Sequence, residues 1–261
     1  MYRPRSAFAV TCSVWKALFL REAVSRLFKG RATWFWMLFE PIFHVAYLVL
    51  IYNVLRVRSV GGIDTTVWLI IGLLAFFMFR RTGMQSMNAL SANESLFAYR
   101  QVKPVDTVLV RCALEGFLMA IIAALLFLAA ALLGYPVIPA DPLTVIAAFF
   151  GLWLFGVGFG LLASVTNELI EELGNVITLA MMPLYMISGV VFPLSAVPLP
   201  YRDWLMHNPV AHGLELARAG FAPYYHAVPG VSMDYLYGSA LVVVFFGLAL
   251  HRRFELRLAT Q

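Results

Sequence analysis

The chain has 261 residues, of which 62% are hydrophobic and 13% are charged, and this balance excludes an ordinary soluble globular domain. Its formal net charge of +5 would suit a nucleic-acid-binding protein, but the basic residues are spread among segments that flank apolar stretches. We therefore interpret them as signals of membrane topology and expect no nucleic-acid partner.

The first predicted element is an amphipathic helix over residues 14–29 that lies along the membrane surface. At helical spacing its residues form one apolar arc and one polar arc. The apolar arc contains Phe19, Leu20, Ala23, Val24, Leu27 and Phe28, and the polar arc contains Arg21, Glu22, Ser25, Arg26 and Lys29. We expect the apolar arc to face lipid and the polar arc to face water beside an anionic leaflet.

Six apolar stretches follow, and a helix of about 20 apolar residues is long enough to cross the hydrocarbon core of a bilayer. They cover residues 33–55, 66–88, 107–133, 143–165, 174–193 and 234–251. The sequence therefore predicts an all-α polytopic membrane protein with six transmembrane helices in a single domain, 1–261. A tail and interfacial helix at 1–32 precede the spans at 33–251, and a second tail follows at 252–261.

Lys and Arg residues gather on one side of these predicted spans. Fifteen of the 19 lie before the first span, around the 80–111 loop or in the C-terminal tail. Cytoplasmic loops collect such residues, so we predict that both termini are cytoplasmic. The outward segment before the last span is too apolar for a soluble loop and too rich in Pro for a span. We predict that it forms re-entrant or interfacial helices.

Ionisable residues inside the spans are candidates for function, because a charge at membrane depth is costly. Glu40 and His44 lie one helical turn apart with Pro41 between them. They could form a mutual hydrogen bond beside a kink or line a substrate path. Arg80 and Arg81 interrupt the second span. They could extend to lipid phosphates, or face a central cavity where a guanidinium would bind carboxylate or phosphate groups.

Two further spacings predict contacts within the chain. Arg111 and Glu115 lie one turn apart, and we expect them to pair with each other. Gly156 and Gly160 form a GxxxG pattern, which favours close packing between helices of this chain over a dimer contact.

Aromatic residues gather in the outward part of the chain. The candidates are Tyr185, Tyr201, Trp204, Tyr224 and Tyr225. They suit an interfacial aromatic belt, and alternatively the stacking of sugar rings on aromatic faces. The sequence has no phosphate-binding loop and no spacing typical of a metal site or a catalytic nucleophile, so we predict no catalytic residue and no metal on this chain.

Three blocks of sequence resemble the type-2 ABC export permeases, and within them the inner-membrane permease subunit of bacterial capsular polysaccharide exporters. The first is LFLREAVSRLFKGRATWFWMLFEP, with Arg21, Trp34 and Pro41. The second is the loop FRRTGMQSMNALSANESLFAYRQVKPVDTVLVRCALE. The third is FPLSAVPLPYRDWLMHNPVAHGLELARAGF, with Asn208-Pro209 and Arg218. The NELIEELGN loop departs from the family pattern, because it is denser in acidic residues.

The resemblance implies a permease without covalent chemistry in the bacterial inner membrane. It implies a homodimer with two copies of a separate nucleotide-binding ATPase subunit, which would hold ATP and Mg. It further implies a periplasmic adaptor, an outer-membrane exit protein and a lipid-anchored anionic polysaccharide as cargo, with membrane lipids around the chain. Residues 91–106 resemble the coupling helix, and the ATPase contacts would be Asn93, Glu94, Leu96, Phe97, Tyr99 and Arg100.

Three other interpretations remain open from the sequence. The cargo could be another lipid-linked glycan, such as O-antigen or teichoic acid. The chain could be a membrane-embedded transferase that uses Glu40 and His44 as acid and base. It could also be a non-transporting subunit that anchors other proteins, which the charges inside the spans make less attractive.

Overall fold

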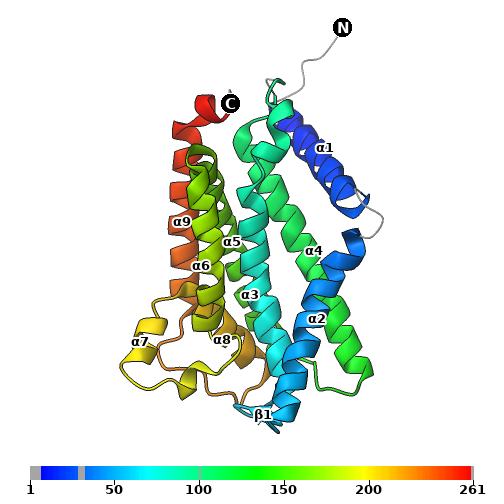
Figure 1. The fold of residues 1–261 in the computed structure, drawn as a ribbon, viewed down its shortest axis with the longest axis vertical. Coiled ribbons are helices and arrows are strands. Elements are labelled where there is room, and N and C mark those ends of the chain that lie inside the picture. Colours follow the sequence, from blue (N-terminus) through cyan, green and yellow to red (C-terminus); the bar gives the residue numbers. More distant parts are fainter. Residues whose placement is uncertain (1–6, 29–32, 100, 260–261) are drawn as a thin grey trace.

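The computed structural model describes residues 7–28, 33–99 and 101–259 and is mostly helical (Figure 1). Its elements are α1 (Ala7–Phe28), α2 (Thr33–Val54), β1 (Ser59–Val60), β2 (Ile63–Asp64), α3 (Thr65–Met87), η1 (Ser91–Leu96), α4 (Pro104–Leu132), α5 (Pro142–Leu169), α6 (Glu171–Ile187), η2 (Leu194–Ala196), α7 (Tyr201–Leu205), α8 (Pro209–Phe221), α9 (Met233–Arg253) and α10 (Glu255–Ala259). The six stretches predicted as spans coincide with α2, α3, α4, α5, α6 and α9. The largest difference is at the end of α6, predicted at residue 193 and observed at Ile187.

Several of these helices could cross a bilayer. Within the described ranges, four are long and apolar enough by length and composition, namely α3, α4, α5 and α9. Two further apolar helices are shorter than these four. In α2 the apolar segment is Phe39–Val54, and α6 has 17 residues. The chain is therefore a mostly helical protein with several apolar spans, while the number six and the orientation of the ends stay predictions.

The bundle has two distinct ends (Figure 1). We call the end that carries α10, η1 and the start of α1 the terminal end. The opposite end carries the β1–β2 hairpin, α7 and α8, and we call it the hairpin end. The hairpin turns at Gly61 and Gly62, whose φ angles of 58° and 88° lie in the left-handed region that favours glycine.

Polar caps and prolines start the helices at the hairpin end. Asp141 accepts hydrogen bonds from the backbone N–H groups of Leu143 and Thr144 and from the Thr144 hydroxyl. These hydrogen bonds, that of the hydroxyl above all, hold the pKa of Asp141 below its ordinary value. Asn208 caps α8 through the Val210 N–H in the same way. A proline follows each cap at the first helical position, where its missing N–H is not needed.

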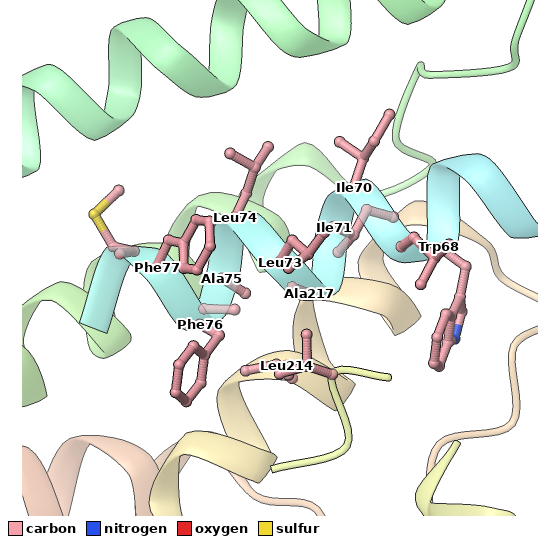
Figure 2. Packing of buried hydrophobic residues seen from close by; sticks show 14 of the residues in the cluster. Trp68, Ile70, Ile71, Leu73, Leu74, Ala75, Phe76, Phe77, Leu214 and Ala217 are labelled. Atoms are coloured by element: carbon pink, nitrogen blue, oxygen red, sulfur yellow. The ribbon is translucent and has the colours of Figure 1, made fainter. Parts of the chain in front are cut away.

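Helix α3 forms the centre of the core. Most of its side chains are buried, because other helices cover it on several sides. Figure 2 shows Leu214 and Ala217 of α8 directed toward α3 near Leu73 and Phe76. A span surrounded in this way needs apolar residues on every face, which explains why the VWLIIGLLAFFMF run lacks helical periodicity.

The glycines of α5 permit close packing on two faces. A Cβ on Gly156 would lie 2.9 Å from the backbone oxygen of Phe79 in α3, and one on Gly158 would lie 2.6 Å from the backbone nitrogen of Val244 in α9. Gly160 lies against Ser86 of α3. The prediction that the GxxxG pattern serves packing within the chain is confirmed.

Helix α1 departs from the sequence prediction at two positions of its polar arc. Glu22 and Arg26, assigned to the water-facing arc, are largely buried against α4, while Leu20 and Val24 of the apolar arc are exposed. The predicted orientation is therefore wrong for Glu22 and Arg26. The reason is that α4 carries partners of opposite charge, which attract these two side chains toward the protein.

Candidate functional site

An ionic cluster joins α1 to α4 near the terminal end. Arg111 of α4 donates to Glu22 of α1, with 2.6 Å between Nε and Oε1, and Glu115 of α4 pairs with Arg26 of α1. Glu115 is fully buried, and the Arg26 guanidinium also lies 3.3 Å from Glu22. The predicted pairing of Arg111 with Glu115 is therefore wrong, because each finds its partner on α1. These short, buried contacts fix the position of α1.

The same cluster continues to α3 and α2 through looser contacts. Arg81 lies 3.6 Å from Glu115 and 3.6 Å from Glu40 of α2, and Arg80 lies 3.7 Å from Glu40. The Glu40 side chain is 53% exposed and that of Arg80 is 40% exposed. The cluster thus changes from tight, buried contacts between α1 and α4 to a loose part on α2 and α3, where Glu40 and Arg80 are partly exposed and Arg81 is largely buried.

A cavity of about 290 Å³ opens beside this loose part. Residues of α2, α3 and α6 line it, among them His44, Phe76, Phe77, Arg80 and Tyr185. The His44 Nε2 lies 2.9 Å from the Tyr185 hydroxyl, and the rings of Phe76 and Phe77 pack edge-on against these two side chains. The structure therefore brings together His44 of α2, Arg80 of α3 and Tyr185 of α6, three candidates that the sequence did not connect.

Glu40 and His44 do not bond to each other in this arrangement. Glu40 pairs with the two arginines of α3, and His44 bonds to Tyr185. The hydrogen bond between Glu40 and His44 that their spacing suggests is therefore not formed, and each side chain contacts another helix instead. The acid and base that a transferase would use are each engaged elsewhere. Over the described ranges, no group of three or more His, Cys, Asp or Glu side chains could hold a metal ion.

The predicted coupling segment lies at the terminal end and contacts α1. Asn93 of η1 is buried, accepts a hydrogen bond from Arg21 of α1 at 2.9 Å, and donates to the Ala89 carbonyl. Phe97 packs against a small core cluster, Leu96 is half-buried, and Glu94 is exposed. Tyr99 is 66% exposed. Arg100 lies outside the described residues. The segment therefore presents side chains outward while one amide fixes it to α1.

The outward aromatic candidates divide into exposed and buried ones. Tyr201 and Trp204 of α7 are exposed and pack edge-on, with ring centroids 5.7 Å apart. Tyr224 is also exposed, and Tyr225 is buried. Its hydroxyl donates to the Glu215 carboxylate at 3.0 Å, so it is engaged within the protein. Burial is the main cause that raises the pKa of Tyr225 to about 12.

Sequence reasoning missed a second buried ionic group at the hairpin end. The guanidinium of Arg218 is fully buried, lies 3.6 Å from the centre of a Trp68 ring, and lies 3.3 Å from Glu215. It also donates to the carbonyls of Gly189 and Val190, at 2.8 and 3.3 Å. This group joins α8 to α3 and to the segment after α6. The spacing of Glu215 and Arg218, three apart on a helix, was the signal that could have revealed it.

Removal of the buried carboxylate from the inner cluster is expected to destabilise the protein. The substitution Glu115→Ala leaves Arg26 and Arg81 without this partner, and breaking a buried pair costs about 3–5 kcal/mol. Thermal unfolding in mild detergent should show a clearly lower unfolding temperature for this variant than for the wild type. Glu255→Ala is the matched control, because its exposed pair with Lys103 at 3.5 Å contributes about 0–1 kcal/mol. Equal unfolding temperatures for the two variants would contradict the expectation.

The family of this chain follows from comparison with known proteins. The family model for the ABC-2 type transporter matches residues 13–222, which is most of the chain. The chain therefore belongs to the ABC-2 type transporter family, and the resemblance seen in its sequence is confirmed.

Several curated proteins are similar over nearly the whole length. The chain is 35% identical over 257 residues to the polysialic acid transport protein KpsM of Escherichia coli, covering 98% of this chain and 99% of that one. It is 28% identical over 257 residues to the capsule polysaccharide export inner-membrane protein CtrC of Neisseria meningitidis serogroup B, covering 95% and 94%. It is 25% identical over 252 residues to the capsule polysaccharide export inner-membrane protein BexB of Haemophilus influenzae, covering 96% of this chain and 94% of that one.

Proposed function

We propose that this chain is the permease subunit of an ABC exporter that moves lipid-anchored capsular polysaccharide across the bacterial inner membrane. The similarity over nearly the full length to KpsM, a polysialic acid transport protein, carries this proposal. CtrC and BexB, both named as capsule polysaccharide export inner-membrane proteins, support it. The family membership and the apolar helices support a multi-pass location in that membrane.

The finer architecture belongs to the same proposal. Six helices would span the membrane, with the terminal end in the cytoplasm, and α7 and α8 would enter the outer leaflet without crossing. Two copies of the chain would form a dimer with two copies of an ATPase subunit, which holds ATP and Mg. A periplasmic adaptor and an outer-membrane exit protein would receive the polymer.

Contacts in the structure support a physical route from the ATPase to the candidate site. A motion of η1 would act on α1 through Asn93 and Arg21. The ionic cluster would pass the displacement from α1 to α4, then to Arg81 of α3 and to Glu40 of α2. ATP binding would thereby bias the equilibrium between conformations of the helices near the cavity. Coupling along this route is a proposal that double-mutant cycles can test.

Affinity purification tests the first part of the proposal. The tagged chain, extracted in mild detergent, is expected to bring with it an equimolar subunit that hydrolyses ATP. A chain that purifies alone and acts on a sugar substrate would overturn the exporter and favour the transferase.

A deletion strain tests the cargo. Loss of an exporter should leave capsular polymer inside the cell and none on the surface, whereas loss of a biosynthetic enzyme would leave none in either place. Antibody staining of intact and permeabilised cells distinguishes these outcomes. Normal surface capsule without the chain would contradict the proposal.

A further inference from the structure

Glu40 and its two arginines differ from the buried ion pairs that join α1 to α4. Charge-assisted hydrogen bonds are typically about 2.7–2.9 Å long. The distances from Glu40 to Arg80 and Arg81 are 3.7 and 3.6 Å, so neither arginine lies within ordinary hydrogen-bond distance. Glu22 and Glu115, by contrast, make short contacts in buried surroundings. The Glu40–Arg80 pair joins two partly exposed side chains over a long contact, and such a pair contributes little stability. Arg81 is only 11% exposed, but it keeps Glu115 as a second carboxylate 3.6 Å away. Glu40 can therefore leave its arginines at small cost.

The position of this pair argues against a purely structural role. Glu40 and the arginines lie in segments with strongly apolar flanks, where a charge is retained mostly for a partner or a wet cavity. Arg80 borders the cavity between α2, α3 and α6, and Glu40 is half-exposed beside it. Displacing Glu40 would leave a guanidinium with its donor groups at the cavity edge, available to an incoming oxyanion.

The cavity itself has the features of a site for one sugar ring. Its volume of about 290 Å³ is near the lower limit of small-ligand pockets, roughly 300 Å³. The rings of Phe76 and Phe77 supply apolar faces, and the His44–Tyr185 pair supplies hydrogen-bonding groups. An apolar body with a few polar groups suits the mixed surface of a sugar. A lipid phosphate would use Arg80 without needing the rest of the cavity.

We propose that Glu40 is a displaceable counter-ion, and that the cavity between α2, α3 and α6 binds one acidic sugar residue whose carboxylate replaces Glu40 at Arg80. This inference rests on the proposed function, because it takes the cargo to be a polysaccharide. It assigns Glu40 the role of keeping Arg80 and Arg81 neutralised between cargo residues. Neutral glycans cannot compete for the arginines, so the exchange selects for acidic ones.

Binding of defined oligosaccharides to the intact complex tests the proposal. The complex with its ATPase subunit is placed in phosphatidylcholine nanodiscs, and fluorescent sialic acid hexamer is the acidic probe, with maltohexaose as the neutral one. The wild type should bind the acidic probe more tightly, with an affinity that falls as salt is added. Arg80→Ala should weaken binding about tenfold, the effect of one lost charge-assisted contact.

The decisive variant is Glu40→Gln, which removes the competitor while keeping the shape of the side chain. It should bind the acidic probe several-fold more tightly than the wild type, a gain that misfolding cannot produce. Two matched controls lie elsewhere. Glu255→Gln is the control for Glu40→Gln, because it removes a half-exposed carboxylate that is paired at 3.5 Å. Arg253→Ala is the control for Arg80→Ala, because the Arg253 guanidinium lies 5.9 Å from the centre of a phenylalanine ring and that of Arg80 lies 6.0 Å from the centre of the Phe77 ring. Both should bind like the wild type.

Several results would overturn the inference. Equal binding of both probes, or unchanged binding in Glu40→Gln, would exclude the exchange. Equally tight binding of glycerol 1-phosphate and of the acidic probe, both weakened by Arg80→Ala, would assign the arginines to phosphate groups such as those of lipids instead. Each of these outcomes leaves the proposed function standing, because the complex under test already contains the ATPase. Failure of that subunit to co-purify would refute the function itself.

Discussion

Replacing Arg218 with alanine is expected to destabilise the folded chain severely and to lower its yield. The guanidinium stacks on Trp68, pairs with Glu215 and donates to two backbone carbonyls. Its removal leaves a fully buried carboxylate without its cation, which costs about 3–5 kcal/mol. Typical domains are stable by only about 5–15 kcal/mol. Because this group holds α8 against α3, its loss affects the whole hairpin end.

Protein yield and thermal unfolding in detergent measure this effect. Arg58→Ala is the control, since Arg58 is an exposed arginine at the same end of the bundle. The double substitution Arg218→Met with Glu215→Gln should recover part of the loss, because it removes the buried charge together with its partner. Equal unfolding temperatures for Arg218→Ala and Arg58→Ala would contradict the structural role given to Arg218.

Tyr99→Ala is expected to reduce association with the proposed ATPase subunit about 30-fold or more. Tyr99 follows η1 and is among the more exposed aromatic side chains at the terminal end. Exposed tyrosines that become buried at an interface often contribute about 2 kcal/mol or more to binding. The loss should appear in the amount of ATPase that co-purifies and in the export of capsule, while the chain itself stays folded.

Phe8→Ala provides the comparison for this substitution. Phe8 is an exposed aromatic residue of α1, near the same end but outside the proposed coupling segment. We expect wild-type amounts of ATPase with this variant. Equal loss from both would indicate a general effect of removing surface aromatics, and no loss from Tyr99→Ala would place the interface elsewhere.

The helices of this protein were predictable from local pattern, but their ionic contacts were not. Apolar length alone located α3, α4, α5 and α9, because a membrane requires it. The pairs of Glu22 with Arg111 and of Arg26 with Glu115 each join residues 89 positions apart. A pairing rule based on one helical turn could therefore only suggest Arg111 with Glu115, which is not the pair that forms.

The candidate site shows the same limit. Glu40, His44 and Arg80 are candidates because ionisable groups are costly at membrane depth, and Tyr185 is a candidate as one of the aromatic residues grouped in the predicted outward part. His44, Arg80 and Tyr185 meet around one cavity because of how α2, α3 and α6 pack, which no short-range pattern specifies. Tyr225 was selected by the same reasoning as Tyr224, and only the tertiary structure shows that one is buried and the other exposed.

The glycines of α5 limit where this protein can change shape. Where backbone lies directly on backbone, as at Gly156 and Gly158, there are no side-chain layers to slide, so α3, α5 and α9 should move as one rigid body. The Arg218 group adds α8 to that body. Motion during transport would then be concentrated in α1, α2 and α4, or between the two chains of the proposed dimer, and bending within the central helices would contribute little.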